Sequence, residues 1–177
     1  MCSQPEKIHV IDSLGASLGY GLLGIYANQV LEKTSSWEDA ETQILEIRSR
    51  MRYVFTLDTL EYLVKGGRVS KTAGFIGGLL DVKPLLHFTP DGRIEPFAKV
   101  RSRKAALRKL VDVMLEEIQN PEGQIIGISH ADCPKDAEIL AQEIRNRIQV
   151  KDILISKVGC VVGSHTGPGT LALFYQR

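Results

Sequence analysis

The run Gly163-Ser164-His165-Thr166-Gly167-Pro168-Gly169 places a histidine among three glycines and a proline. Histidine titrates near neutral pH, and both ring nitrogens donate hydrogen bonds when the ring is charged. Glycine adopts positive φ at low cost, and successive peptide N–H groups in such a turn can converge on an anion. The run therefore predicts a site for an acidic group, with a plain glycine-rich turn between two strands as the alternative.

A second run, Lys65-Gly66-Gly67-Arg68, ends a helical pattern in two glycines and then presents an arginine. A glycine pair is a strong helix stop signal. The run has a superficial likeness to a nucleotide-binding P-loop, but Lys71 follows Ser70, whereas the P-loop order requires glycine, then lysine, then serine or threonine. The pattern excludes a P-loop and leaves Arg68 as a candidate anion contact.

Further runs occur in one order along the chain together with these two, and the set resembles the DegV family of bacterial fatty-acid-binding proteins from about Ile8 to Tyr175. The additional runs are Val10-Ile11-Asp12-Ser13, Asp81-Val82-Lys83-Pro84-Leu85-Leu86, Gly92-Arg93-Ile94 and Val100-Arg101-Ser102-Arg103-Lys104-Ala105. Each run is a weak signal by itself. Their combination in this order is specific.

The resemblance implies a lipid-binding protein that is not an enzyme, needs no cofactor and presents a fatty-acid carboxylate to a fatty-acid kinase. Carried over by position, His165, Arg68 and Arg101 line the side of the site that faces the ligand head, and Thr166 and Gly167 accompany the histidine. We expect His165 to donate a hydrogen bond to the carboxylate. A guanidinium fork matches phosphate geometry, so the two arginines are expected to serve the phosphorylated head group or the docked kinase.

The resemblance also implies an apolar tunnel for the acyl tail. The candidate lining residues are Leu57, Ile76, Leu80, Leu85 and Val162. Apolar residues at these spacings would equally well form ordinary core.

In the family pattern a further segment, which carries Thr and Ser hydroxyls that grip the carboxylate, comes before the strand predicted at residues 7–13. The sequence therefore favours a chain whose strand and whose helix at residues 16–33 are covered by another copy, as a homo-oligomer, or by a separate N-terminal chain. The alternative is a truncated structural or interaction domain without independent ligand binding.

Composition limits the other possibilities. The 177 residues contain 22 Lys and Arg against 21 Asp and Glu, so no overall field recruits nucleic acid or a membrane surface. No apolar run reaches the length of a membrane span, the first residues do not resemble a secretion signal, and the three cysteines are widely spaced. These features predict a cytoplasmic protein with reduced thiols and no stable membrane insertion.

Three other functions are weaker readings of the residues. Gly127-Ile128-Ser129-His130-Ala131, followed by Asp152 and His165, resembles a hydrolase nucleophile elbow but lacks its final glycine. The pairs His130–Cys133 and Cys160–His165 could supply zinc ligands. The basic residues from Arg101 to Lys109 form a solvated helix face more simply than a nucleic-acid track.

The element pattern predicts an α/β fold: the mixed C-terminal lobe of a two-lobed structure plus the last strand and helices of the first lobe, divided into residues 1–52 and 53–177. Strands are expected at residues 7–13, 53–57, 85–89, 93–100, 124–129, 153–158 and 170–175. Helices are expected at residues 16–33, 36–52, 58–66, 70–80, 105–119 and 134–148.

Overall fold

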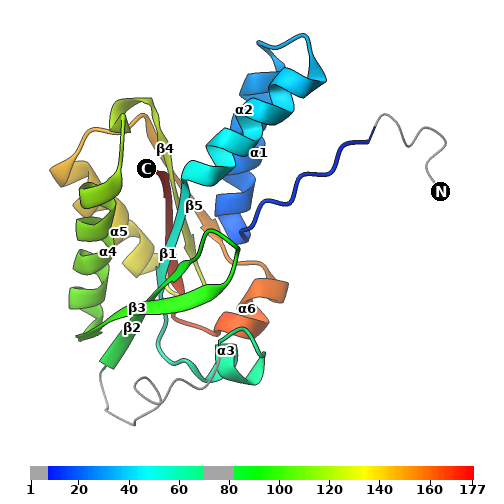
Figure 1. Cartoon of the computed structure of the whole chain (residues 1–177). Coiled ribbons are helices and arrows are strands. Elements are labelled where there is room, and N and C mark those ends of the chain that lie inside the picture. The colour runs from blue at the N-terminus through cyan, green and yellow to red at the C-terminus, as the bar shows by residue number, and fades with distance from the viewer. Residues whose placement is uncertain (1–7, 70–81) are drawn as a thin grey trace.

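A computed structural model describes residues 8–69 and 82–177, which form one mixed β-sheet with helices on both faces (Figure 1). The helices are α1 (Ser17–Leu31), α2 (Trp37–Arg50), α3 (Glu61–Lys65), α4 (Arg103–Glu117), α5 (Pro134–Arg147) and α6 (Cys160–Thr166). The strands are β1 (Met51–Thr56), β2 (Val82–Phe88), β3 (Ile94–Arg101), β4 (Ile125–His130), β5 (Asp152–Lys157) and β6 (Leu171–Gln176). The predicted mixed α/β architecture is confirmed.

The six strands lie in the order β3-β2-β1-β6-β4-β5. The last strand of the chain, β6, lies between β1 and β4 and runs antiparallel to both. Only β4 and β5 are parallel among the described strands, and α5 connects them across one face, as a parallel pair requires. The centre of the sheet therefore joins the first strand to the last.

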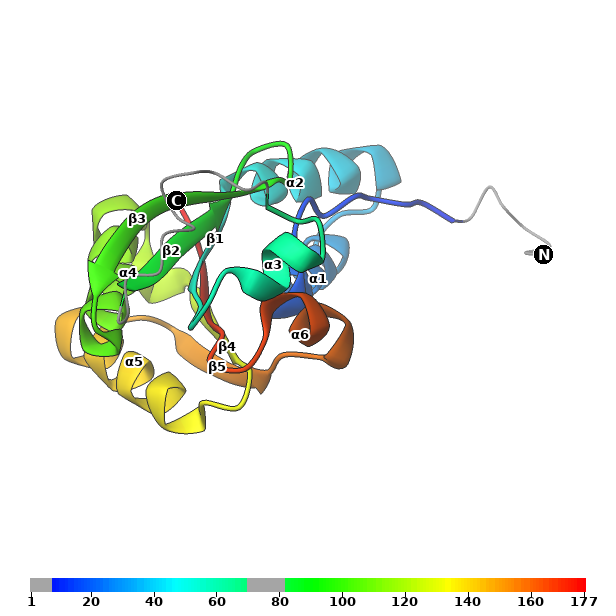
Figure 2. The ribbon, with the colours of Figure 1, turned by 90° about the horizontal axis from the view of Figure 1, so that it is seen from below.

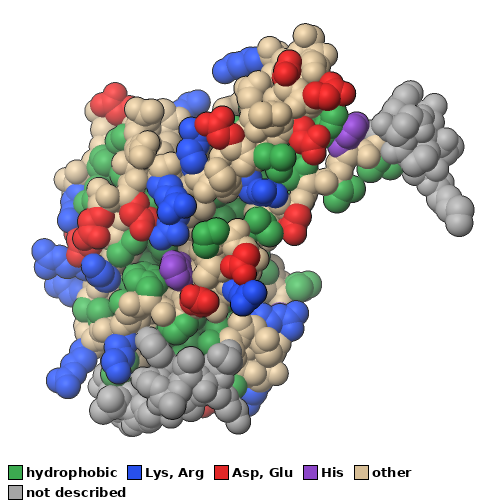
Figure 3. All heavy atoms as spheres, in the orientation of Figure 1, with side chains coloured by type: hydrophobic (Ala, Val, Ile, Leu, Met, Phe, Trp, Pro, Cys, Tyr) green, Lys and Arg blue, Asp and Glu red, His purple; other side chains and the backbone are tan. Residues whose placement is uncertain are grey.

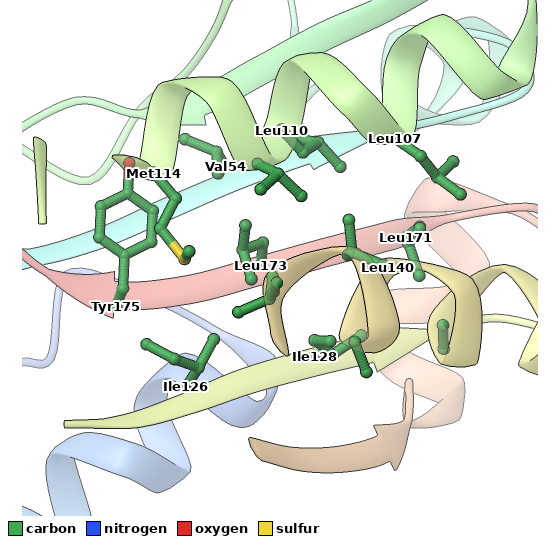
Figure 4. Close-up of a cluster of buried hydrophobic side chains, with 14 of the residues drawn as sticks. Val54, Leu107, Leu110, Met114, Ile126, Ile128, Leu140, Leu171, Leu173 and Tyr175 are labelled. Carbon is green, nitrogen blue, oxygen red and sulfur yellow. The ribbon is translucent and has the colours of Figure 1, made fainter. Parts of the chain in front are cut away.

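Both faces of the central strands are buried, because successive side chains of a strand such as β6 point to opposite sides of the sheet, and each side carries a core. Leu171, Leu173 and Tyr175 point to a core beneath α4 and α5, shown in Figure 4. Ala172 and Phe174 point to a second core beneath α1 and α3. Because side chains of a strand alternate between faces, a continuous apolar strand can serve two cores.

Helix boundaries follow local sequence signals. Ser36 precedes α2 and its hydroxyl accepts a hydrogen bond from the Asp39 amide at 3.3 Å, while Glu38 and Asp39 occupy the positive end of the helix. Pro134 occupies the first turn of α5, where its missing N–H has no partner to lose. These two helix starts match the predicted ones.

One sequence prediction and one alternative interpretation are wrong. Residues 8–13 form no strand in the part of the chain that the structure describes; they run as an extended segment away from the sheet (Figure 1), with Val10 88 % exposed. The glycine-rich run near the C-terminus is not a turn between two strands, because residues 160–166 form the short helix α6. The predicted helix at residues 70–80 lies outside the described residues.

Helix α1 is covered within this chain. Leu22 is fully buried and belongs, with Tyr26, to the same core as Tyr53 and Phe174. The expectation that this helix is bare without a second chain is wrong for its main apolar face. The division at residue 52 stays a prediction, and side chains from both sides of it share this core.

A half-buried ion pair ties the C-terminal end of α4 to the middle of the sheet. The guanidinium of Arg52 donates to both oxygens of Glu117 at 2.8 and 2.9 Å, and the Tyr175 hydroxyl donates to the same carboxylate at 2.6 Å. Burial alone would raise the pKa of Glu117, but the hydrogen bonds from Arg52 and Tyr175 outweigh burial, so this pKa lies below its usual 4.5. The carboxylate is thus held in its charged form.

This network predicts how stability depends on pH. Because the folded pKa of Glu117 is lowered, its stabilising contribution is present above its unfolded value of about 4.5 and disappears as the pH falls through the folded value. Tyr175→Phe should lower the free energy of unfolding at neutral pH by about 1.5 to 3 kcal/mol, the value of a hydrogen bond to a charged group. Urea unfolding at a series of pH values measures both effects, and Glu117→Gln should flatten the acid limb. An unchanged acid limb in Glu117→Gln would contradict this account.

Candidate functional site

A cavity of about 690 Å³ lies on the face of the sheet that α1, α3 and α6 cover, and we call it the sheet cavity. Its lining residues are Ala16, Ser17, Phe55, Leu63, Gly67, Arg68, Val69, Phe88, Gly92, Arg93, Ile94, Glu95, Val158, Val161, Val162, His165, Thr166, Thr170, Ala172 and Phe174. This volume is in the range of small-molecule sites, and the lining is mostly apolar with a few polar groups, as in such sites.

The floor of the sheet cavity is formed by the central strands, on the side of the sheet that faces α1 and α3. Phe55 of β1 is the register partner of Ala172 of β6, and both point into this face together with Phe174. Ala172 is the smallest side chain of the three, so the floor is lower between the two phenylalanine rings. Strand alternation thus turns the sequence Ala172-Leu173-Phe174 into a cavity floor on one side and core on the other.

Helix α6 forms one wall. Val162, His165 and Thr166 are three and four residues apart, which places them on one side of a helix, and all of them line the cavity. His165 is half-buried in the last turn, and Gly167 ends the helix with φ of 77°. A residue with a side chain is strained at that angle, so the glycine allows the chain to leave the helix here.

Close contacts between backbone and side chains hold α3 against α6, which lie side by side in Figures 1 and 2. A Cβ atom at Gly66 would overlap the imidazole of His165, and one at Gly167 would overlap the ring of Tyr62. Gly66 has φ of −77°, an angle that any residue adopts, so its missing side chain matters for space alone. Gly66 therefore fixes where the imidazole lies, and Gly167 leaves room for the ring of Tyr62.

Two arginines lie beside the cavity opening. Arg68 is exposed, and its guanidinium donates to the main-chain carbonyl of Gly66 at 2.6 Å, so the side chain folds back over the turn that contacts His165. Arg93 follows the β2–β3 turn and pairs with Asp91 at 2.8 Å. Basic groups thus flank a cavity whose floor is apolar.

Hydroxyl groups complete the polar part of the wall. Thr166 and Thr170 are buried, and their hydroxyls donate to main-chain carbonyls at 3.1 and 2.7 Å. Ser17, at the start of α1, has φ of 57°, and its hydroxyl donates to the buried hydroxyl of Ser129 at 3.0 Å. A left-handed angle in a residue other than glycine costs roughly 1 to 2 kcal/mol, and strain of this kind often occurs at binding sites.

The structure brings together four of the predicted site residues. His165, Arg68, Val162 and Thr166 all line the sheet cavity, and Gly167 is buried directly after Thr166. Their roles in binding stay predictions.

The remaining predicted residues are not among the lining residues. Arg101 is exposed at the end of β3, and Leu57 is fully buried in the core next to the cavity. Leu85 points to the opposite face, into the core beneath α4. Ile76 and Leu80 lie outside the described residues.

Several lining residues were missed by the sequence analysis. Phe55, Ala172 and Phe174 could have been found from strand alternation, had the partner strand been known. Ser17, Phe88 and Arg93 carry no local signal, because their place in the wall depends on how α1 and the hairpin pack.

The alternative chemistries receive no support from the geometry. Ser129 is fully buried on β4 and its hydroxyl pairs with Ser17 and Ser156, not with a histidine. Among residues 8–69 and 82–177 no three His, Cys, Asp or Glu side chains gather as metal ligands, so the set of His130, Cys133, Cys160 and His165 is not assembled. A search of the same residues finds no helix with the length and apolar character of a membrane span.

Comparison with known proteins supplies the family. The family model described as "Uncharacterised protein, DegV family" matches residues 1–177. The chain belongs to the DegV family. A DegV domain-containing protein of Clostridium perfringens is 44 % identical over 168 residues, which is 95 % of this chain and 58 % of that protein.

Solved DegV structures share the fold. A fatty-acid-binding DegV protein of Thermus thermophilus superposes with a TM-score of 0.88 at 28 % identity, covering 98 % of this chain and 62 % of the other. The fatty acid kinase (Fak) B3 protein of Streptococcus pneumoniae, loaded with linoleic acid, gives 0.85 at 27 % identity, covering 96 % and 60 %. This DegV chain thus spans about three fifths of the length of these relatives.

The contact between Gly66 and His165 predicts the effect of a single methyl group. Gly66→Ala should displace the imidazole and lower the free energy of unfolding by about 1 to 3 kcal/mol, because an overpacked contact must open. NMR of the His165 ring protons and thermal unfolding measure the two effects. Gly123→Ala is the matched control, because nothing lies within 4 Å of the added atom there. Ring shifts that do not change in Gly66→Ala would show that the contact does not position His165.

Proposed function

We propose that this DegV chain binds a long-chain fatty acid in the sheet cavity, with the acyl tail over Phe55, Ala172 and Phe174 and the carboxylate beside His165. The observation that carries the proposal is the division of the cavity wall: an apolar floor formed by the sheet, and an imidazole with a neighbouring guanidinium at one side. A fatty acid has the same division into tail and charged head. The relatives described as fatty-acid-binding support the choice of this ligand over other amphipathic molecules.

The head of the ligand is expected to contact His165, not the arginines. His165 lines the cavity and its ring is held by Gly66, whereas the Arg68 guanidinium is exposed and bonded to a main-chain carbonyl. A positioned imidazole loses little conformational freedom when it binds a carboxylate. An exposed arginine can leave its carbonyl contact for a more highly charged group.

We further propose that the bound carboxylate is presented to a fatty-acid kinase, as the name of the pneumococcal relative suggests, and that the chain itself performs no chemistry. Arg68 lies at the cavity opening, where the phosphorylated head or the kinase would meet it. Arg101, at the end of β3, is proposed as a contact of the kinase alone.

The first test concerns the histidine. His165→Ala should weaken fatty-acid binding by about 1.5 to 3 kcal/mol, because a charge-assisted hydrogen bond is lost. Lipid mass spectrometry of the purified protein and titration with a fluorescent fatty acid measure retention and affinity. His87→Ala is the control, since His87 does not line the sheet cavity. Equal retention in His165→Ala and His87→Ala would refute the head-group assignment. Absence of any bound lipid in the parent protein would favour the structural or interaction domain.

The second test separates binding from presentation. Arg68→Ala and Arg101→Ala should reduce kinase-dependent acyl phosphorylation by at least about tenfold while changing fatty-acid affinity less than about threefold, since a carboxylate is satisfied by imidazole and hydroxyls. Transfer of labelled phosphate from ATP by a bacterial fatty-acid kinase measures the first effect, and the fluorescent titration measures the second. Arg108→Ala, on the exposed side of α4, is the control. Parallel losses of affinity and phosphorylation in either variant would contradict this division of roles.

A further inference from the structure

A second pocket, of about 230 Å³, lies where the end of α2 meets the sheet, and we call it the arginine pocket. Its lining residues are Ser13, Leu14, Arg48, Ser49, Met51, Arg52, Tyr53, Phe88, Thr89, Pro90 and Arg177. Phe88 lines both this pocket and the sheet cavity, so its ring is part of the wall between them. Figure 3 shows Lys and Arg side chains grouped on this face beside the foot of α2.

The charged residues of the arginine pocket are all of one sign. Arg48, Arg52 and Arg177 line it, and none of its lining residues is Asp or Glu. Arg52 is balanced by its bidentate pair with Glu117. Within residues 8–69 and 82–177, Arg48 and Arg177 form no ion pair. Arg177 does interact electrostatically with Glu117 and helps to lower the pKa of that carboxyl, so Arg48 is the arginine of the pocket for which the described residues provide no counter-charge.

Polar hydrogens in the walls also lack partners. The Nη1 atom of Arg48 donates to the main-chain carbonyl of Asp12 at 3.0 Å, but its Nε atom is buried and unpartnered among the described residues. The hydroxyl of Tyr53, a residue only 4 % exposed, is also buried without a partner in the part of the chain described. A buried donor without a partner costs about 1 to 3 kcal/mol, so two at one pocket call for an explanation.

The dipole of α2 does not account for these features. Arg48 and Arg50 both lie in the last turn of α2, where positive charge is favourable. Arg50 satisfies that preference on the surface, paired with Glu46 at 3.4 Å. Arg48 instead lines the pocket together with Tyr53, whose pKa burial raises to about 12, so that its hydroxyl remains a neutral donor at physiological pH.

We propose that the arginine pocket binds a small oxyanion, a phosphate group, between the guanidiniums of Arg48 and Arg177. Guanidinium forks bind phosphate through paired charge-assisted hydrogen bonds, and the unpartnered hydroxyl of Tyr53, a residue of the pocket wall, is a further donor. The group belongs either to free inorganic phosphate or to the terminal phosphate of a phosphomonoester. This proposal does not depend on fatty-acid binding, which takes place in the sheet cavity.

Calorimetric titration of the intact chain with inorganic phosphate and, separately, with glycerol 3-phosphate tests the proposal. Arg48→Gln should raise the phosphate Kd by roughly ten- to hundredfold, the loss expected for a charge-assisted contact. Arg50→Gln, the matched control two residues away on the surface, should change it less than about twofold. Binding of both probes identifies the terminal phosphate of a monoester as an acceptable ligand, and binding of inorganic phosphate alone identifies the free anion.

Two further variants keep the test valid if Arg48→Gln unfolds. Arg177→Gln, at the exposed residue directly after β6, should also weaken phosphate binding by about tenfold or more. Tyr53→Phe removes an unpartnered hydroxyl, so it should not lower the melting temperature without phosphate but should reduce the rise in melting temperature that phosphate produces. Failure of both probes to bind at millimolar concentration, or equal weakening by Arg48→Gln and Arg50→Gln, overturns the proposal.

Discussion

The antiparallel pair of β1 and β6 is the interaction on which the rest of this DegV chain depends. Its register, from Met51 opposite Gln176 to Thr56 opposite Leu171, decides which side chains face α4 and α5 and which face α1 and α3. A shift by one residue would turn Phe55 and Phe174 into the wrong core and place Val54 and Leu173 at the cavity floor. The site and the core are thus two faces of one pairing, made by strands that are far apart in sequence.

Space for a ligand arises because small residues lie at two places, Ala172 on the floor of the sheet cavity and Gly66 against His165 of its wall. Ala172 lies between larger rings on the floor, and Gly66 allows the turn after α3 to approach the imidazole of His165. Protein interiors are otherwise close-packed, so a cavity of this size needs both a low floor and walls held apart. Helices α3 and α6 are short and would not be stable alone, hence their mutual contacts and the sheet beneath them hold the walls in place.

The sequence predicted most strands and the long helices because their signals are local: continuous apolar runs for β1 and β6, the capping residue Ser36 for α2 and the first-turn Pro134 for α5. The predictions that failed, for α6 and for residues 8–13, have physical causes. Helix α6 was missed because Gly163 and the β-branched Val161 and Val162 lower helix propensity, and packing overrides that preference. Residues 8–13 have the apolar composition of a strand, but no neighbouring strand pairs with them in the described part of the chain.

Some residues of the candidate site were likewise predictable from local sequence signals, and others were not. Local motifs identified His165, Arg68 and Thr166, since glycine-rich runs mark places where backbone and side chain approach closely. Among apolar candidates the sequence could not separate Leu57 and Leu85 from Val162, because all three are apolar and only strand pairing and helix packing decide which face each side chain occupies. Phe88 illustrates the limit best. It lines both an apolar cavity and a basic pocket, and this position depends on segments that are far apart in the sequence, so no local window of the sequence contains it.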